Sequence, residues 1–396
     1  MNILMVNATN FGSTGEIMLG IAEAARERGH TVFTAVPDSR DNRRRGEVEG
    51  QMLIGGRISR NLHRLSAKYL AMDGRLSRIA TRRLIREIEH RGIELVHLHN
   101  LHGSYLNLGM LLGHLKRRGI RTVMTLHDCW TFTGHCPHFD FQGCDKWKSG
   151  CHSCPLHREY PECVLDDSRR NYKYKRACFT EHPDLEIVTP SAWLASLVAE
   201  SYLAKYPTRV IYNGIDLDVF KPTESDIRDR LGIGERKMLL GVAFSWEGRK
   251  GLDAFLELRR RLGDEYAIVL VGDMGAATHE GIISIPRTHD RRELAELYTA
   301  ADLFVNPTKE DNFPTVNLEA LASGTPVLTY KTGGSPESVD PSCGSVVQRD
   351  DISALLSEVI RITGEKPFSP ADCIARARGF DRGARFAEYV DLYEKK

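Results

Sequence analysis

The sequence predicts an α/β protein built from two Rossmann-like, doubly wound domains. Three observations support this prediction. Short apolar segments alternate with helical segments, the alternation recurs in both halves of the chain, and glycines and polar residues follow the apolar segments. Such alternation is typical of parallel sheets covered by helices. A chain of 396 residues is also long enough for two domains.

The first half opens with an apolar strand over residues 1–8, the glycine turn 11–15 and a helix that runs through Arg28. Gly29 then suits the end of that helix, because glycine readily adopts the left-handed conformation found there. Further strands are expected at residues 31–36, 94–100, 121–128 and 185–191, and in the second half at 237–244, 266–273, 302–307 and 326–330.

The boundary between the two halves is expected near the proline- and glycine-containing segment 205–222. We therefore predict an N-terminal domain over residues 1–207 and a C-terminal domain over 208–380. A last helix, 381–396, is expected to return toward the N-terminal domain.

Composition favours an ordinary globular protein. No apolar run approaches the roughly 20 residues that span a bilayer, and the first ten residues resemble a strand rather than a signal peptide. A cytoplasmic location is therefore expected, in which thiols stay reduced.

The net charge of +1 hides an asymmetry between the two halves. Residues 1–207 contain 29 Lys and Arg against 22 Asp and Glu, a net charge of +7, and the remainder carries −6. Nucleic acid is a weak candidate partner, because basic residues do not alternate with aromatic ones and no binding motif is present.

One basic segment has the spacing of an amphipathic helix. Its apolar residues recur at helical intervals, and such a helix suits either an anionic membrane surface or packing on its own domain. The apolar positions are Ile58, Leu62, Leu65 and Tyr69, interspersed with Arg57, Arg60, Arg64 and Lys68.

The most informative segment is 307–334, in which a strand is followed by an acidic turn, a helix, a second strand and a Gly-Gly turn. A helix that starts near Thr315 directs backbone N–H groups and the positive end of its dipole outward, which suits a phosphate. Glu319 on that helix, with Glu310 and Asp311 before it, can accept hydrogen bonds from sugar hydroxyls. Together these groups suit a nucleotide-sugar, although an ordinary capped helix has a similar pattern.

Motifs in a fixed order along nearly the whole chain resemble retaining GT-B glycosyltransferases of family 4, including enzymes of bacterial polysaccharide assembly. The matching segments are the turn with Gly12 and Gly15, VHLHN, TLHD, TPSAWLA, VIYNGID, RKGLD and EDNFPTVNLEALASGTPV. The resemblance implies a GT-B fold with two domains facing across a cleft and the donor held mainly by the C-terminal domain.

The resemblance also implies roles for single residues. Glu319 matches the glutamate that holds the donor ribose, and the backbone amides of Thr315 and Val316 match groups that meet the sugar and diphosphate. Lys250 matches the lysine that offsets charge on the leaving diphosphate, a largely electrostatic contribution. His127 matches a histidine near the transferred sugar. Gly12 and Gly15 would let the backbone approach the donor or the acceptor closely.

Two positions depart from the family pattern. The family glutamates are separated by seven residues, whereas eight lie between Glu310 and Glu319. Asp311 has the expected spacing, so we favour Asp311 as the sugar contact, with Glu310 as the alternative. The family arginine six residues before Lys250 is replaced by Phe244, and Arg249 is a partial substitute.

A cysteine-rich insertion follows the strand that ends at Asp128. It spans about residues 129–163 and contains six of the nine cysteines. Four of them have a spacing that suggests a structural zinc ion, although free thiols and disulfides are alternatives. These four are Cys136, Cys144, Cys151 and Cys154. The insertion is expected to border the acceptor side of the site.

The resemblance implies a hexosyltransferase that uses a nucleotide-sugar, with UDP favoured, and a glycan or polyprenyl-linked acceptor. No cofactor is expected for catalysis, and peripheral contact with the inner face of the membrane is expected. The alternatives are a GT-B sugar-nucleotide epimerase and an inactive nucleotide-sugar-binding scaffold. A NAD-dependent oxidoreductase is disfavoured, because the first turn lacks the GxGxxG pattern.

Overall fold

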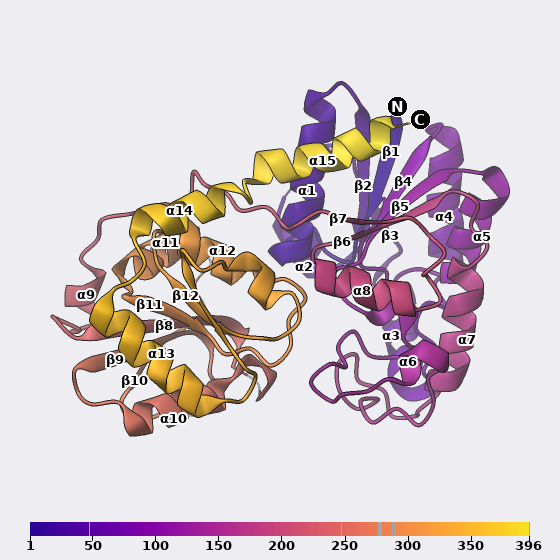
Figure 1. The fold of residues 1–396 in the computed structure, drawn as a ribbon. Helices are drawn as coiled ribbons and strands as arrows, with labels where there is room; N and C mark the ends of the chain where they lie inside the picture. Colours follow the sequence, from indigo (N-terminus) through magenta and orange to yellow (C-terminus); the bar gives the residue numbers. More distant parts are fainter. Residues whose placement is uncertain (47, 247, 276–278, 287, 289, 396) are drawn as a thin grey trace. The chain divides into compact units, whose positions relative to one another are not determined.

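The computed structural model describes residues 1–46, 48–246, 248–275, 279–286, 288 and 290–395 (Figure 1). The chain divides into two compact units. The N-terminal unit comprises Met1–Ile211 together with Phe386–Lys396, and the C-terminal unit comprises Tyr212–Arg385.

The N-terminal unit contains a seven-stranded sheet in the order β3-β2-β1-β4-β5-β6-β7, and every paired strand is parallel to its neighbour. The chain therefore winds outward from β1 in both directions, as in a Rossmann-like domain. The strands are β1 (Asn2–Val6), β2 (Thr31–Pro37), β3 (Gln51–Ile54), β4 (Leu95–Leu98), β5 (Arg121–Thr125), β6 (Leu185–Thr189) and β7 (Thr208–Val210).

The C-terminal unit repeats the scheme with six parallel strands in the order β10-β9-β8-β11-β12-β13. The two sheets confirm the predicted α/β class with two doubly wound sheets. The strands are β8 (Lys237–Ser245), β9 (Tyr266–Asp273), β10 (Ile282–Ile285), β11 (Leu303–Asn306), β12 (Val327–Tyr330) and β13 (Gly344–Val347).

Four strands were absent from the expected set, and all four lie at the edges of the sheets. Edge strands are covered less completely, so their residues need not form the continuous apolar run of a central parallel strand. The burial of β7 and β10 agrees with this, because none of their residues is fully buried. The four are β3, β7, β10 and β13.

Helices connect most consecutive strands and cover the sheets (Figure 1). Those of the N-terminal unit are α1 (Gly12–Glu27), α2 (Arg40–Arg44), α3 (Arg57–Leu70), α4 (Arg78–His90), α5 (Leu108–Arg118), α6 (Lys146–Ser149), α7 (Ser168–Phe179) and α8 (Ala192–Glu200), with η1 (Trp130–Phe132). Those of the C-terminal unit are α9 (Ile227–Arg230), α10 (Leu252–Arg261), α11 (Arg291–Ala300), α12 (Thr315–Ala322), α13 (Ile352–Glu365) and α14 (Pro370–Arg378), with η2 (Gly248–Lys250) and η3 (Ser335–Ser338).

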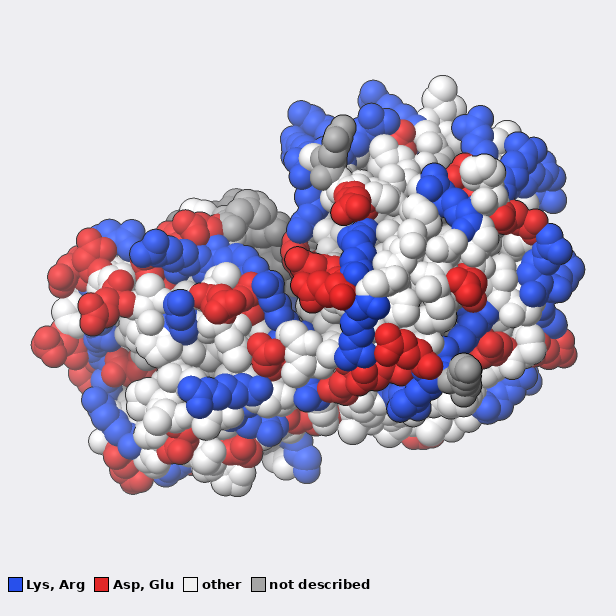
Figure 2. Space-filling view, turned by 90° about the horizontal axis from the view of Figure 1, so that it is seen from above, with Lys and Arg blue, Asp and Glu red and all other residues white. Residues whose placement is uncertain are grey.

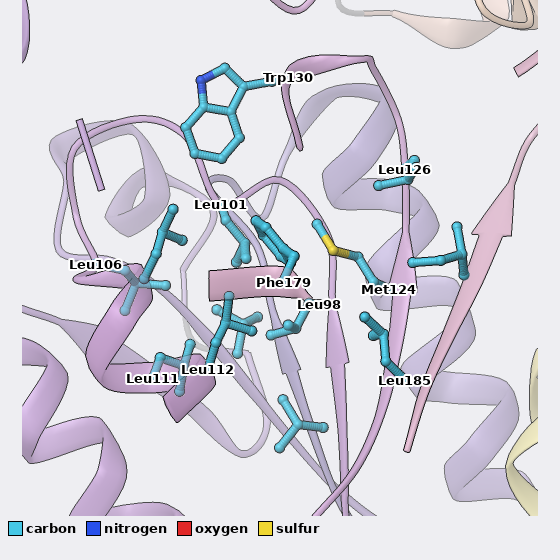
Figure 3. Packing of buried hydrophobic residues seen from close by; sticks show 14 of the residues in the cluster. Leu98, Leu101, Leu106, Leu111, Leu112, Met124, Leu126, Trp130, Phe179 and Leu185 are labelled. Carbon is cyan, nitrogen blue, oxygen red and sulfur yellow. The ribbon is translucent and has the colours of Figure 1, made fainter. Parts of the chain in front are cut away.

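The largest core lies on one face of the N-terminal sheet, where strand residues pack against α5 and α7 (Figure 3). Leu98 of β4 and Met124 of β5 meet Leu112 of α5 and Phe179 of α7 in this cluster. Trp130 lies at the end of the cluster just beyond the carboxyl end of β5, so the first residues of the cysteine-rich insertion belong to this core.

The last helix, α15 (Arg382–Glu394), packs on α1 in the N-terminal unit (Figure 1). A Cβ atom at Gly20 would lie 2.1 Å from the Phe386 ring, so glycine allows the two helices to approach closely. Arg28, which directly follows α1, also forms an ion pair with Asp391 at 2.6 Å. Most of α15 thus belongs to the unit that contains β1.

Acidic and basic side chains are interspersed over the face of the molecule shown in Figure 2. This face, seen from above in the orientation of Figure 1, shows no field of a single sign. Within the described ranges, no helix combines the length and the apolar character needed to cross a membrane.

Candidate active site

The predicted donor site begins where β11 ends and α12 starts. Pro314 precedes α12 and supplies no side-chain acceptor, so the first backbone N–H groups donate no hydrogen bond to a capping side chain. Thr315 and Val316 in the first turn are half-buried. The start of α12 therefore has the partial positive charge and the free donors that suit a phosphate.

Lys250 and Asp311 form an ion pair in this region. The Lys250 Nζ lies 2.7 Å from Asp311 Oδ2, and both side chains are about one-fifth exposed (22% and 20%). The structure thus places the predicted phosphate-binding lysine beside the carboxylate expected at the sugar. Because both groups remain partly accessible, a diphosphate can compete with Asp311 for Lys250.

Two glycines allow the surrounding loops to pack on the segment that carries Asp311. At Gly333, φ is +54° and a Cβ atom would lie 1.8 Å from the Asp311 carbonyl oxygen. At Gly251, φ is +78° and a Cβ atom would lie 2.2 Å from the Pro307 carbonyl oxygen. Neither position can accept a side chain without displacement of the backbone that carries the acidic turn.

Glu319 lies one turn into α12 and accepts a hydrogen bond from the Tyr298 hydroxyl at 2.8 Å. Burial raises the pKa of Glu319 above its usual range, although the Tyr298 hydrogen bond and the charge of Arg291 oppose that shift. The Tyr298 hydroxyl thereby orients one carboxylate oxygen of Glu319. The carboxylate can still accept a hydrogen bond from a hydroxyl group of a bound ligand.

The remaining predicted donor-site residues differ in exposure. Glu310 is only 5% exposed, whereas Phe244, at the position of the family arginine, is 67% exposed. Arg249 is half-buried, and its carbonyl oxygen accepts the Lys309 backbone N–H at 2.8 Å. The backbone of Arg249 therefore anchors the acidic turn.

A buried polar network supports this site, and the motif comparison had not singled out its members. Asn317 accepts a hydrogen bond from Asn306 at 2.8 Å and donates to Ser335 at 3.1 Å and Ser338 at 2.9 Å. The network joins the end of β11, the first turn of α12 and η3. In the sequence, the only indication of this network was an asparagine in the first turn of a helix that follows a strand.

In the N-terminal unit, the predicted turn 11–15 is not separate from the helix, because α1 begins at Gly12 and both glycines lie in its first turn. Gly12 has φ +68°, and a Cβ atom at Gly15 would lie 2.6 Å from the carbonyl carbon of Asn10. Asn10 is itself buried and donates to the Asn42 carbonyl and to Gln51, each at 2.9 Å. The first turn of α1 is therefore packed closely against the segment that follows β1.

His127 follows β5 and stacks on His99, which follows β4. The ring centroids are 5.2 Å apart, and Nδ1 of His99 lies 2.9 Å from Nε2 of His127. Burial lowers the pKa of His127 to about 4, so its imidazole is neutral near neutral pH. A neutral imidazole can donate or accept a hydrogen bond, but it provides no positive charge.

A second pair at the same sheet edge, His102 and Asp128, had not been predicted. The His102 Nε2 lies 2.9 Å from Asp128 Oδ2. Burial disfavours both charges, but the mutual attraction prevails: the pKa of His102 is raised and that of Asp128 is lowered to about 2. Neighbouring parallel strands bring their carboxyl ends together, but the sequence motifs do not show that β4 and β5 are neighbours.

A cavity of about 560 Å³ lies beside this pair. Gly103 and Ser104, which directly follow His102, line it, and so does Tyr160, whose hydroxyl lies 3.4 Å from His102 Nδ1. Lys175 also lines the cavity, and burial lowers its pKa to about 8. The volume suits a sugar-sized ligand. The cavity is bounded by α3, α7 and the cysteine-rich insertion.

The four cysteines of the predicted zinc site line one small cavity of about 10 Å³ in the insertion, together with Trp147. All four thiols are free, and Cys151 accepts a hydrogen bond from the Gly134 backbone N–H at 3.1 Å. Across the described part of the chain, no group of three or more His, Cys, Asp or Glu is arranged to hold a metal ion. Four thiols suit zinc chemically, and zinc stays a prediction. The four are Cys136, Cys144, Cys151 and Cys154.

The two doubly wound units, with a donor-type site after β11 and a second polar site after β4 and β5, define a protein of the glycosyltransferase class. Comparison with known proteins supports this directly. The model of Glycosyltransferase Family 4 matches residues 15–219, and that of Glycosyl transferases group 1 matches residues 236–393.

Relatives and solved structures agree with the family models. The chain is 26% identical over 318 residues to the putative colanic acid biosynthesis glycosyl transferase WcaC of Escherichia coli, covering 76% of each chain. It is 29% identical over 243 residues to a GDP-mannose-dependent phosphatidylinositol monomannoside mannosyltransferase of Mycolicibacterium smegmatis, covering 52% of this chain and 62% of that one. The fold matches Anabaena Alr3699/HepE, solved with UDP, with a TM-score of 0.70 at 16% identity over 99% of each chain.

This chain belongs to glycosyltransferase family 4, and it has the GT-B fold of its structural neighbours. The predicted family and enzyme class are thereby confirmed.

Proposed function

We propose that this glycosyltransferase transfers a hexosyl residue, with retention of anomeric configuration, from a nucleotide-sugar to a glycan or polyprenyl-linked acceptor in polysaccharide biosynthesis. The observation that carries the proposal is the grouping of Lys250, Glu319 and the uncapped start of α12 in one unit. These groups together provide a cation and backbone donors for a diphosphate and a carboxylate for a ribose.

Each group contributes a separate step. The amides of Thr315 and Val316 and the Lys250 ammonium stabilise the charge that develops on the departing diphosphate. Glu319, oriented by Tyr298, accepts hydrogen bonds from the ribose hydroxyls. Once Lys250 binds the phosphate, Asp311 accepts a hydrogen bond from a hydroxyl of the transferred sugar. Glu310 is the alternative contact. Neither a protein nucleophile nor a catalytic metal is required by this scheme.

The N-terminal unit supplies the acceptor side of the proposal. The cavity beside His102 and Asp128 is large enough for a sugar ring, and Lys175 favours an anionic group within it. His127 contributes a neutral ring that can hydrogen-bond a sugar hydroxyl. The cysteine-rich insertion forms part of the cavity wall and would shape acceptor recognition. A polyprenyl carrier would place the protein at the inner face of the membrane.

UDP is the nucleotide that we favour, and the complex of Anabaena HepE with UDP supports it. The mannosyltransferase of M. smegmatis, which is GDP-mannose-dependent, supports the competing choice. Sugar nucleotides with different nucleobases are therefore compared in the same experiment.

The test is a thermal-shift screen of the intact protein against UDP-, GDP- and ADP-sugars. A ligand at a concentration of 100 Kd stabilises the native state by about 2.7 kcal/mol, so the correct base should raise Tm clearly. The shift should disappear in Glu319→Ala and shrink in Lys250→Ala. A shift with GDP-sugars alone would overturn UDP, and no shift with any sugar nucleotide would overturn the donor site.

The stereochemical part of the proposal has its own measurement. Transfer or slow hydrolysis of the stabilising donor, followed by NMR of the product, shows the anomeric configuration before the sugar mutarotates. Retention is expected, and an inverted product would contradict it.

A further inference from the structure

Helix α3 exposes its apolar side chains to solvent instead of packing them on the domain. Ile58 is 78% exposed and Leu62 61%, while Leu65 and Tyr69 are about half exposed. At 3.6 residues per turn, these four positions fall within an arc of about 60°. The buried side of the helix is instead occupied by His63, which is fully buried and lies 2.8 Å from the Ser77 hydroxyl.

Basic residues flank this apolar stripe on one side. Arg57, Arg64 and Lys68 project beside it at the same helical spacing, and the first two are exposed. An apolar stripe bordered by Lys and Arg, on a helix of low mean hydropathy, is the pattern of helices that lie in the membrane interface. The positive charges complement anionic lipid headgroups.

A loop of the cysteine-rich insertion extends the same apolar surface. The backbone N–H of Val164 donates to the Lys68 carbonyl oxygen at 2.7 Å, and Lys68 Nζ lies 2.8 Å from Glu162. These bonds hold the loop 160–165 against the end of α3. The loop adds exposed apolar side chains at Tyr160, Val164 and Leu165, which are 65%, 44% and 53% exposed.

The cavity of about 560 Å³ lies between these two elements. Arg64, Leu65 and Tyr69 of α3 line it on one side, and Tyr160 and Pro161 of the loop line it on the other. Residues of both exposed apolar segments therefore form part of the wall of the cavity. This arrangement matches a ligand whose polar head enters the protein while its hydrocarbon tail stays in the lipid.

We propose that α3 and the loop 160–165 form one docking surface for an anionic lipid bilayer, called here the α3–loop surface, and that it positions the cavity at the membrane face. The role of the cavity in holding a lipid-linked acceptor rests on the proposed function. The docking itself follows from exposure and charge alone, so the two can be tested apart.

The docking test is flotation of the intact protein with vesicles, measured against vesicle concentration. Vesicles of phosphatidylcholine containing about a third phosphatidylglycerol are compared with pure phosphatidylcholine. The wild-type protein should float with the anionic vesicles, and higher salt should weaken binding. Ile58→Ser/Leu62→Ser, Leu165→Ser and Arg57→Glu/Arg64→Glu should each weaken binding roughly tenfold or more, because apolar area and charge both contribute.

Matched controls come from the C-terminal unit. Ile360 is 51% exposed on α13, and Arg378 is exposed on α14. Ile360→Ser and Arg378→Glu should float as the wild type does. If they weaken binding as much as the α3 variants, or if the wild type fails to float with anionic vesicles, the α3–loop surface does not dock on lipid.

Analytical ultracentrifugation tests whether a second copy of the protein, and not a membrane, covers the α3–loop surface. Self-association that disappears in Ile58→Ser/Leu62→Ser, without vesicle binding, would show that a second copy covers the surface and would overturn the proposal. The nucleotide-sugar thermal shift serves as an independent measurement, because its residues lie in the C-terminal unit. If the wild-type protein does not float with vesicles but a nucleotide-sugar raises its Tm, only the docking proposal is contradicted. If it floats but no nucleotide-sugar raises its Tm, only the donor proposal is contradicted.

Discussion

Lys250 and Asp311, 61 positions apart in the chain, lie 2.7 Å apart as an ion pair in the proposed donor site. From the sequence, Lys250 was expected to contact the diphosphate and Asp311 the transferred sugar. Under the proposed function, Asp311 holds the Lys250 ammonium in place before the donor binds. Because both side chains are partly exposed, the carboxylate can be exchanged for a phosphate at modest cost.

Replacement of Lys250 by alanine should lower kcat by roughly 100-fold or more, because a cation aimed at the leaving group acts mainly in the transition state. Lys250→Arg should retain more activity. Steady-state kinetics with the donor identified by thermal shift provide the measurement. Lys221→Ala removes an exposed lysine of the same unit and should leave kcat unchanged. Equal kcat in Lys250→Ala and the wild type would exclude this role.

Tyr298→Phe should weaken donor binding roughly tenfold, as expected for loss of a hydrogen bond to a charged group. It should also change the pH profile. Burial already raises the pKa of Glu319, and loss of the Tyr298 hydrogen bond removes an opposing effect, so the pKa rises further. Donor binding needs the ionised carboxylate, and the acidic fall in donor affinity should therefore begin at a higher pH in the variant. Titration calorimetry across the acidic range measures this, and an unshifted profile would contradict it.

Gly333→Ala should destabilise the C-terminal unit by about 3 kcal/mol, from the positive φ and from the clash with the Asp311 carbonyl. Gly364→Ala is the control, since a Cβ atom there meets nothing within 4 Å. That exposed helical glycine should give a neutral or slightly stabilising change, up to about 1 kcal/mol. Denaturant unfolding of both variants provides the comparison, and equal stabilities would show that the turn can relax.

Acid should destabilise the N-terminal unit through its buried histidines. Burial lowers the pKa of His97 to about 3, so below its usual pKa of 6.5 the unfolded state binds a proton that the folded state does not. At pH 5 this costs about 2 kcal/mol relative to neutral pH. The His102–Asp128 pair acts in the opposite sense, because its raised histidine pKa contributes stability below pH 6.5 that is lost as pH rises.

The measurement for His97 is the fall in Tm between pH 7 and pH 5. The fall should be smaller in His97→Gln, which retains polar groups toward Tyr393 and Thr125 but cannot titrate. A fall equal to that of the wild type would show that other groups dominate the acid sensitivity.

Purified protein should contain about one zinc ion per chain if the four clustered thiols bind the metal. Cys151→Ser and Cys154→Ser should then lose zinc, whereas Cys178→Ser, outside the small cavity, should retain it. Elemental analysis combined with thiol titration of the unfolded chain decides the matter. Absence of zinc with all nine thiols titrating would refute the zinc prediction.

The sequence alone was sufficient for the central strands and for the family. Strands such as β1 and β9 are buried on both faces, so their apolar runs are long and easy to recognise. The edge strands β3, β7, β10 and β13 were missed for the converse reason. Glu319 and Lys250 could be proposed as donor-site residues from the sequence because they stand in contiguous motifs, and their roles stay predictions.

Pairings between distant segments could not be read from the motifs. The His102–Asp128 pair and the Asn317 network depend on which strands are neighbours, and spacing along the chain does not provide that information. The orientation of α3 is a similar case. Its periodicity was compatible with an apolar face turned to the core or to solvent, and only the packed structure shows that Ile58 and Leu62 face outward.

The sequence by itself therefore determined the α/β class, the family and the residues of each motif, because local periodicity and contiguous motifs are properties of neighbouring residues. Only the tertiary structure decided which of those residues meet, because side chains such as Lys250 and Asp311 are brought together by parallel strands and tight glycine turns. It also decided which apolar face stays exposed, because burial depends on what the rest of the chain leaves uncovered.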